Sequence, residues 1–244
     1  MPYRRLPNTD NARIKAMNRA FEKGTELPPF KLAFSQAMFH QVRSILPAFK
    51  NAISEHRNSL SLHAEKNKEY HVRMKKARLY ISHFIQVVDM AVARGEQAPS
   101  IRSFYGLNED EKKLPNLITE EEIISCGTKL IEGERTRKLN GSTPITNPTI
   151  ALVQVHFDKF LEAYNHQKSL KRRSTSAHES LEEMRQRIDN IIQQTWNEIE
   201  DTFKDLPEEI KREKASDYGI VYVFRKNELN GNEVLIDEEM DQAG

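Results

Sequence analysis

Residues 74–92, MKKARLYISHFIQVVDMAV, carry apolar side chains at steps of three, four and seven, and this spacing places them on one face of a helix. The same pattern recurs 107 positions later. The two matching stripes are Met74, Ala77, Ile81, Phe84, Ile85, Val88 and Val92, and Leu181, Met184, Ile188, Ile191, Ile192, Thr195 and Ile199. A second pair of stripes lies upstream, 111 positions apart: Phe39, Val42, Leu46, Phe49 and Ile53, and Ile150, Val153, Phe157, Phe160 and Tyr164.

This repeat predicts a mainly α fold, a pseudo-duplicated antiparallel four-helix bundle made of two long helical hairpins, 33–95 and 148–206. We expect the chain to reverse near residues 63–68 and again at 171–176. Pro47 removes one backbone donor, which predicts a kink or a break in the first helix. Since each amphipathic hairpin needs the other to bury its stripe, residues 1–244 are interpreted as a single domain.

Three smaller elements complete the expected fold. An N-terminal helix spans 9–23, with Thr9 or Asp10 as its cap and Gly24 as its end. The bridging segment 96–147 contains a helix from about 120 to 138, with a capping box at its start. The last element is a β-hairpin at 216–237, with a turn at Asn230-Gly231. It either packs on the bundle or pairs its free edge with a strand of a partner.

Composition restricts the class of protein. The chain has 244 residues, 38% of them hydrophobic and 30% charged, which is typical of a globular protein rich in amphipathic helices. The net charge of +1 predicts no general attraction to nucleic acid or anionic lipid, so such binding would need a local patch. A single cysteine, no secretory signal and no long apolar run predict a cytoplasmic protein without a membrane partner.

No catalytic, cofactor or metal motif is recognisable. Glu-x-x-His and His-Glu-x-x-His pairs are missing from the sequence, as are phosphate loops, dinucleotide fingerprints and nucleophile elbows. The one cysteine, Cys126, has apolar neighbours in the bridging helix and is interpreted as an inert buried thiol. We therefore assign no catalytic, cofactor-binding or metal-binding residue.

Positive charge is concentrated near the two expected hairpin turns. Residues 56–78 contain seven Lys or Arg and two Glu, and residues 166–178 contain four Lys or Arg and no acidic residue. This concentration of positive charge could bind the phosphates of nucleic acid or another anion. Alternatively, the Lys and Arg side chains could simply be solvated at exposed helix ends. Tyr70 is the one aromatic residue available there for stacking on bases. The candidate contacts are Arg57, Lys66, Lys68, Lys75, Lys168, Lys171, Arg172 and Arg173.

The bridging segment offers a second candidate site. Glu134, Arg135 and Arg137 could face a groove between the hairpins, because irregular segments on a rigid scaffold often carry function. The same residues could equally form surface ion pairs that contribute little.

Four short segments carry a resemblance: MPYRRLPNTD at residues 1–10, Tyr105-Gly106-Leu107, Leu114-Pro115 and PITNP at residues 144–148. Together they make the chain resemble an uncharacterised all-helical family of Bacteroidetes-type bacteria. The resemblance implies a bacterial cytosolic helical protein and no particular activity, ligand or catalytic residue.

Three hypotheses of function follow. The first is a non-catalytic protein-interaction or scaffold module that uses the bundle surface or the β-hairpin edge. The second is a nucleic-acid or anion binder that uses the basic residues. The third is an enzyme of unrecognised type with its site near the bridging segment. The sequence leaves the oligomeric state and the identity of a partner open.

Overall fold

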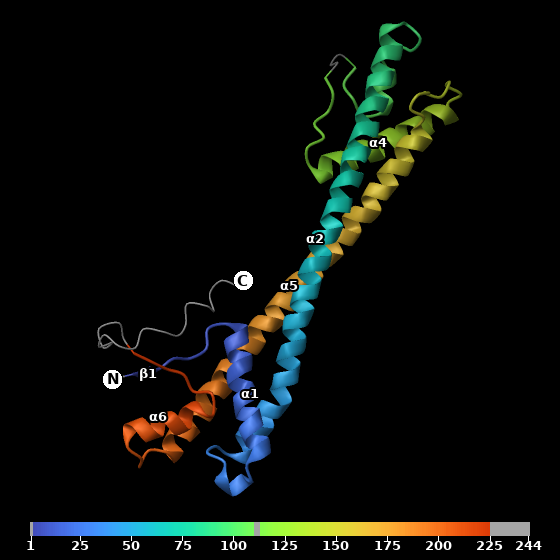
Figure 1. Ribbon diagram of the computed structural model, residues 1–244. Helices are drawn as coiled ribbons and strands as arrows, with labels where there is room; N and C mark the ends of the chain where they lie inside the picture. The colour runs from blue at the N-terminus through green and yellow to red at the C-terminus, as the bar shows by residue number, and fades with distance from the viewer. Residues whose placement is uncertain (1, 110–112, 225–244) are drawn as a thin grey trace. The chain divides into compact units, whose positions relative to one another are not determined.

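The computed structural model describes residues 2–109 and 113–224 of the chain (Figure 1). This part is mainly helical and contains a small two-stranded sheet. It divides into two compact units, each described by itself below. Unit 1 consists of residues 1–57 and 176–244, and unit 2 of residues 58–175. Two long helices, α2 (Gln36–Ala93) and α5 (Ile150–Thr202), run through both units.

The two expected helical hairpins are wrong, because α2 and α5 are each one uninterrupted helix. The chain does not reverse at 63–68 or at 171–176. Between Pro47 and Gly95, and again between Pro148 and Pro207, the sequence contains neither glycine nor proline, so nothing there breaks a helix. Pro47 itself lies inside α2 and does not end it. Gly95 adopts a positive φ of 76° two residues after α2, as expected for a helix stop.

Unit 1 contains β1 (Tyr3–Arg4), α1 (Asp10–Glu26), a 3₁₀ turn η1 (Pro29–Lys31), the start of α2, the end of α5, α6 (Glu208–Ser216) and β2 (Tyr222–Val223). Thr9 caps α1 as expected, since its side chain accepts a hydrogen bond from the N–H of Ala12. The expected end of this helix at Gly24 is wrong. Gly24 lies inside α1, where a Cβ would collide with the ring of Phe39.

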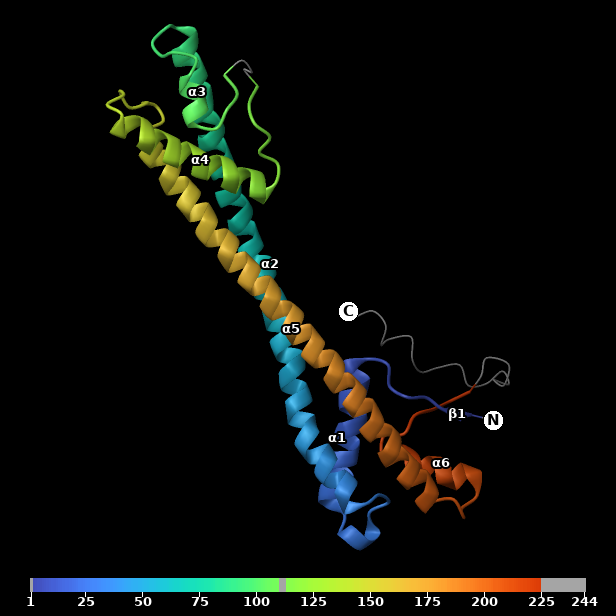
Figure 2. The same cartoon turned by 180° about the vertical axis from the view of Figure 1, so that it is seen from behind.

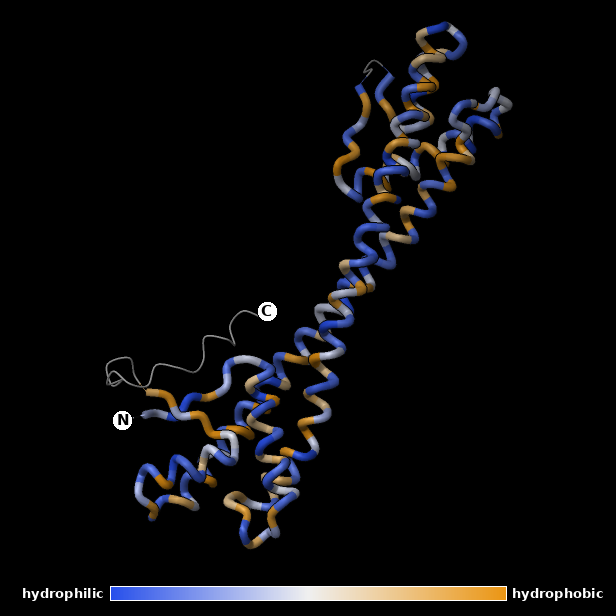
Figure 3. Tube along the Cα trace, viewed as in Figure 1, coloured by the Kyte–Doolittle hydropathy of each residue, from blue (hydrophilic) through white to orange (hydrophobic). Residues whose placement is uncertain are grey.

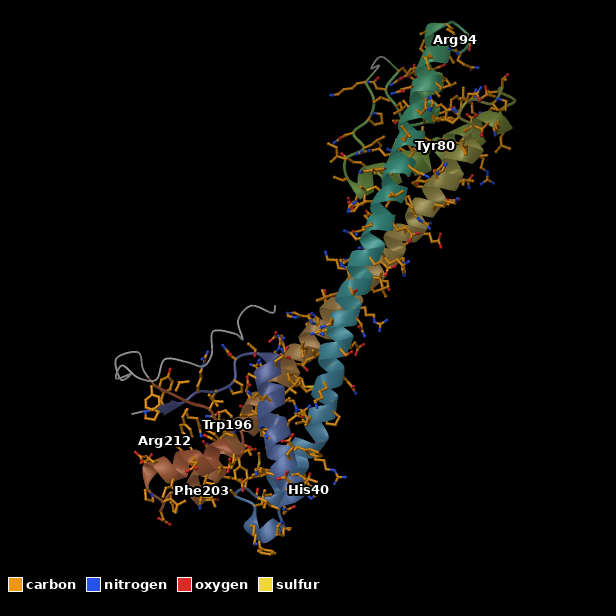
Figure 4. All side chains as sticks on the ribbon, in the orientation of Figure 1. His40, Tyr80, Arg94, Trp196, Phe203 and Arg212 are labelled. Atoms are coloured by element: carbon orange, nitrogen blue, oxygen red, sulfur yellow. The ribbon has the colours of Figure 1, made fainter. Side chains whose placement is uncertain are left out.

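The small sheet joins the two ends of unit 1 rather than forming the expected hairpin. Tyr3 pairs with Val223 and Arg4 with Tyr222, in antiparallel register. A strand therefore exists within the first half of the expected hairpin, as β2, and its partner is the N-terminal segment. The expected turn at 230–231 and the second strand of the hairpin lie outside the described residues. Trp196 packs nearby in the core at 1% exposure, with the Arg4 guanidinium 6.0 Å from its ring (Figure 4).

Unit 2 contains the rest of α2 and α5 together with α3 (Ile101–Phe104) and α4 (Glu120–Leu139). The expected bridging helix is confirmed as α4, and its capping box is complete, with Thr119 and Glu122 bonded to each other's backbone N–H. Figure 2 shows α4 lying across α2 and α5. The hydroxyl of Tyr70 on α2 donates to Glu120 at 2.7 Å, and Gly127 of α4 lies against the ring of Phe157 on α5.

The four apolar stripes contribute to the cores or pack against them, but they do so in an unexpected combination. In unit 1 the stripe at 39–53 shares a cluster with the stripe at 181–199. In unit 2 the stripe at 74–92 shares a cluster with the stripe at 150–164. The expected common interior of four helices is therefore replaced by two clusters. Apolar and polar residues alternate along both long helices, as amphipathic packing requires (Figure 3). The interpretation of the whole chain as a single domain stays a prediction.

Candidate functional site

Ten Lys and Arg residues of unit 2 lie on two neighbouring stretches of helix, residues 58–78 of α2 and 165–175 of α5, which we call the basic segment. The two stretches run antiparallel, since Gln167 Nε2 donates to Asn67 Oδ1 at 3.2 Å and the Tyr70 and Phe160 rings lie 6.2 Å apart. The candidate contacts at these positions therefore come together, although along the middle of two helices rather than at hairpin turns. Arg57 is exposed and belongs to unit 1.

Positive charge dominates this segment, with ten Lys or Arg and two Glu. Arg73 is neutralised by Glu69 at 2.6 Å and by Glu162 at 3.7 Å, and Lys66 is 3.6 Å from Glu69. Lys168 lies 5.6 Å from the centre of the Tyr164 ring. Within the described part of the chain, six cations of the segment have neither an acidic partner within 4 Å nor a contact with an aromatic ring: Lys68, Lys75, Lys76, Arg78, Lys171 and Arg172.

The contact between the two helices is polar over part of this segment. Ser59 and Ser174 are buried there at 5% and 9% exposure, and Asn67 and Gln167 bond to each other. Gln167 Oε1 is a buried polar atom without a hydrogen-bond partner among the described residues. Gln167 lines a cavity of about 80 Å³ that contains charges of both signs, Lys66, Glu69, Arg73 and Glu162, with Tyr70, Ala163 and His166. Because the carboxylates offset the cations, this cavity does not favour an anion.

Tyr70 is not available for stacking on a base. The side chain is 6% exposed, and its hydroxyl donates to the Glu120 carboxylate. Burial and this bond raise the pKa of Tyr70, whereas the bond lowers the pKa of Glu120. The one aromatic residue that the sequence offered for stacking is therefore enclosed, because the amphipathic pattern of α2 turns this ring toward the core.

The expected groove at Glu134 and Arg137 is also wrong, since these two side chains are 0% and 2% exposed and lie in the interior. Arg137 Nε donates to Glu134 Oε2 at 2.9 Å, and the Tyr105 hydroxyl donates to the same oxygen at 2.5 Å. The Ile145 N–H donates to Glu134 Oε1 at 2.9 Å, and Arg137 also donates to the Thr143 carbonyl. We call this set the buried ion pair. Arg135, on the other side of α4, is exposed.

The buried ion pair joins α4 to two irregular segments, and its charged and polar groups are hydrogen-bonded to one another. Burial alone would raise the pKa of Glu134, but hydrogen bonds from Arg137, Tyr105 and the Ile145 N–H outweigh it and lower that pKa. Burial and the bond to Glu134 raise the pKa of the Tyr105 hydroxyl. A carboxylate held ionised in this way, with its oxygens bonded, positions segments of the fold and is poorly suited to accept a proton from a substrate.

The remaining candidates for chemistry are equally enclosed. Burial raises the pKa of the Cys126 thiol to about 11, so at neutral pH it is protonated and a poor nucleophile. Among the described residues, no three His, Cys, Asp or Glu side chains come together as a metal site would require. None of the described helices combines the length and apolar character needed to cross a membrane.

Sequence reasoning missed one feature of unit 2, a pair of rings contributed by α2 and α5, which we call the aromatic patch: Tyr80 and His156, with Leu152 one turn before His156. The Tyr80 and His156 rings stack with their centres 4.0 Å apart and their planes 14° from parallel. Leu152 is 41% exposed, whereas the exposed Leu79 and Val155 lie on the sides of α2 and α5 that face away from the other helix. The stripes at 74–92 and 150–164 contain the neighbours of these residues, but only the pairing of α2 with α5 brings the two rings together.

No protein-family model, no curated protein and no solved structure matches this chain. The resemblance to an uncharacterised helical family therefore stays an expectation.

Proposed function

We propose that this protein is a non-catalytic binding protein whose basic segment binds the phosphate backbone of a nucleic acid. The observation that carries the proposal is the group of six exposed cations on adjoining stretches of α2 and α5 that have no acidic partner among the described residues. Like charges held this close repel one another, and a polyanion relieves the repulsion while it releases its own counterions.

The geometry favours contact with the backbone rather than the bases. The unpaired groups are long, flexible Lys and Arg side chains on helix surfaces, which suit phosphate contacts that carry no sequence information. The buried Tyr70 leaves the segment without the aromatic platform typical of single-strand binders. Duplex and single strand should therefore bind without strong preference for sequence.

Fluorescence anisotropy with a labelled 20-base-pair duplex, titrated at several salt concentrations, tests the proposal. We expect affinity to fall steeply with salt, because each phosphate contact contributes about −0.9 to the slope of log K against log salt on duplex DNA. The variant Lys171→Glu/Arg172→Glu/Arg173→Glu should lose about tenfold or more in affinity, and its slope should become shallower by about one for each lost contact.

A matched control carries the same change of charge in unit 1, at exposed residues without an acidic partner among the described residues: Lys31→Glu/Arg43→Glu/Arg187→Glu. Equal loss in both variants would mean that net charge alone attracts the duplex. Absence of binding to the unchanged protein at 50 mM salt would end the proposal.

The other two hypotheses stand differently. An enzyme site at the bridging segment is disfavoured, because Glu134 and Arg137 are enclosed and bonded to each other. A protein-interaction role through the bundle surface or the β-hairpin edge stays a hypothesis. A reducing, cytoplasmic location belongs to the proposal as well, and it is supported by the single, buried cysteine.

A further inference from the structure

Two cations of the basic segment, Lys66 and Arg73, are held by carboxylates around one cavity. Arg73 donates to Glu69 at 2.6 Å and lies 3.7 Å from Glu162, and Lys66 is 3.6 Å from Glu69. All four side chains line the cavity of about 80 Å³ between α2 and α5. The two cations therefore face this cavity together with the carboxylates that neutralise them.

Helical register separates these cations from unpaired ones on the same helix. Lys66 and Arg73 are seven residues apart on α2, and so are Lys68 and Lys75, which places each pair on one face of the helix. The second pair lies two residues further along, which turns it by about 200° to the side away from the cavity. Within the described residues, α2 thus carries one row of cations that carboxylates neutralise and one row without an acidic partner.

The two carboxylates hold Arg73 with different strength. Glu69 lies one turn before Arg73, whose hydrogen bond and charge lower the pKa of Glu69, so this carboxylate stays ionised at neutral pH. Glu162 comes from α5, and it is 78% exposed, so its longer contact with Arg73 is open to water. Exposed pairs of this kind add little to folding. Their larger effect is on a polyanion, which meets carboxylates where it would need a cation.

We propose that Glu69 and Glu162 are autoinhibitory carboxylates that withhold Arg73 from the phosphates of the bound nucleic acid. This inference rests on the proposed function of the basic segment and adds a control of its affinity. A guanidinium binds phosphate oxygens as it binds carboxylate oxygens, so a phosphate and Glu69 compete for the same N–H donors. Glu69 has the advantage, because the same helix holds it one turn away. Arg73 is therefore a latent phosphate-binding residue.

Duplex binding in 50 mM salt, measured by fluorescence anisotropy, tests this inference. Glu69→Gln/Glu162→Gln keeps the shape of both side chains and removes both charges. We expect it to bind the duplex about fivefold more tightly, with a slope of log K against log salt that is steeper by about 0.9 for the released Arg73. Adding Arg73→Gln to this variant should remove the gain.

The matched variants Arg73→Gln and Lys75→Gln compare the two rows of α2 in the otherwise unchanged protein. Each removes one cation, but only Lys75 is without an acidic partner among the described residues. Lys75→Gln should weaken duplex binding and make the salt slope shallower by about one, whereas Arg73→Gln should weaken binding clearly less and leave the slope unchanged.

Two further measurements separate the release of Arg73 from a general change of charge. Glu109→Gln/Glu132→Gln removes two exposed carboxylates elsewhere in unit 2 and should tighten binding clearly less. The NMR signal of the Arg73 Nε–H reports on the same event without nucleic acid. Tripolyphosphate should shift this signal in Glu69→Gln/Glu162→Gln and leave it in place in the unchanged protein. Circular dichroism should show all variants to be equally helical.

Three results would overturn the autoinhibition: an equal gain in Glu109→Gln/Glu132→Gln, a gain that survives Arg73→Gln, or an equal shift of the Arg73 signal in the unchanged protein. If the unchanged protein binds the duplex and Glu69→Gln/Glu162→Gln binds it no more tightly, the autoinhibition alone is wrong. If neither protein binds the duplex, the proposed function of the basic segment is wrong as well.

Discussion

One ion pair of unit 2 is enclosed to a degree that the ion pairs between α1 and α5 in unit 1 are not. In unit 1, Arg13 and Arg185 each form a two-pronged pair across helices α1 and α5, with Asp189 and Asp10 respectively, at the protein surface. The side chains of Arg185 and Asp10 are 26% and 21% exposed. In unit 2, Arg137 and Glu134 are 2% and 0% exposed. Water can replace a lost partner in the first case and cannot in the second, so the same chemistry has different consequences.

The largest effect should follow from removing half of the buried ion pair. Glu134→Ala leaves the Arg137 guanidinium buried and deprives Tyr105 and the Ile145 N–H of their acceptor. We expect the free energy of unfolding, measured in urea, to fall by about 3–5 kcal/mol. The double variant Glu134→Leu/Arg137→Met removes both charges and should cost clearly less than the single one. A single variant that costs no more than the double would show that the pair is not as enclosed as described.

The same variant tests whether the chain behaves as a single domain. Hydrogen–deuterium exchange of Glu134→Ala should show faster exchange in peptides from α4. If the units unfold together, the amides of α1 in unit 1 should lose protection by the same free energy. Unchanged protection in α1 would show that the two units unfold separately.

A glycine inside α4 and one inside α1 allow the tightness of packing in the two units to be compared. A Cβ at Gly133 of α4 would meet the backbone carbonyl of Phe104, whereas one at Gly24 of α1 would meet the ring of Phe39. A half-buried ring can shift and a carbonyl in a folded segment cannot. We therefore expect Gly133→Ala to destabilise unit 2 by about 1–3 kcal/mol. Gly24→Ala should cost less, because the better helix propensity of alanine, roughly 1 kcal/mol, offsets part of the strain. Thermal unfolding of both variants makes the comparison, and the reverse order would contradict it.

Sequence reasoning succeeded where the determinants are local and failed where they are distant. Thr119 and Glu122 are three residues apart, so the start of α4 could be read directly. The mostly polar residues 63–68 were interpreted as a turn between two helices. The absence of glycine and proline between Pro47 and Gly95 was the better signal for one continuous helix, since a polar stretch between two apolar ones can remain helical.

The candidate sites show the same limit. Glu134 and Arg137 are three residues apart on one helix face, as surface pairs often are. Their burial depends on Tyr105 and Ile145, which only the tertiary fold brings to them. The stacking of Tyr80 on His156 joins residues 76 positions apart and leaves no pattern in either helix. The gathering of Lys and Arg was visible in the sequence, because charge density requires no knowledge of the fold.

The surface ion pairs of unit 1 should give a smaller effect than the buried pair. Arg185→Gln removes bonds of 2.6 and 2.8 Å to Asp10, but Asp10 keeps solvent and Arg13 nearby. We expect a loss of about 1 kcal/mol in the free energy of unfolding at low salt. This difference between variant and unchanged protein should shrink in 1 M NaCl, because salt screens exposed charges. The cost of Glu134→Ala should persist at the same salt concentration, and equal sensitivity of the two would remove the distinction.

The smallest effect should come from His156, whose environment lowers its pKa through burial and through Lys159 and Lys76. The unfolded chain then binds a proton at this side chain more readily than the folded chain does. Stability is therefore retained above the ordinary histidine pKa and lost as the pH falls through the lowered value. In an NMR titration, the His156 ring should change charge below the range of a free histidine, and Lys76→Gln should move its midpoint upward. In urea unfolding between pH 7.5 and 5, His156→Phe, which keeps a ring on Tyr80, should lose less stability than the unchanged protein. A midpoint for His156 at or above the ordinary value would mean that the stack is open to water, and with it the apolar character of the aromatic patch would be lost.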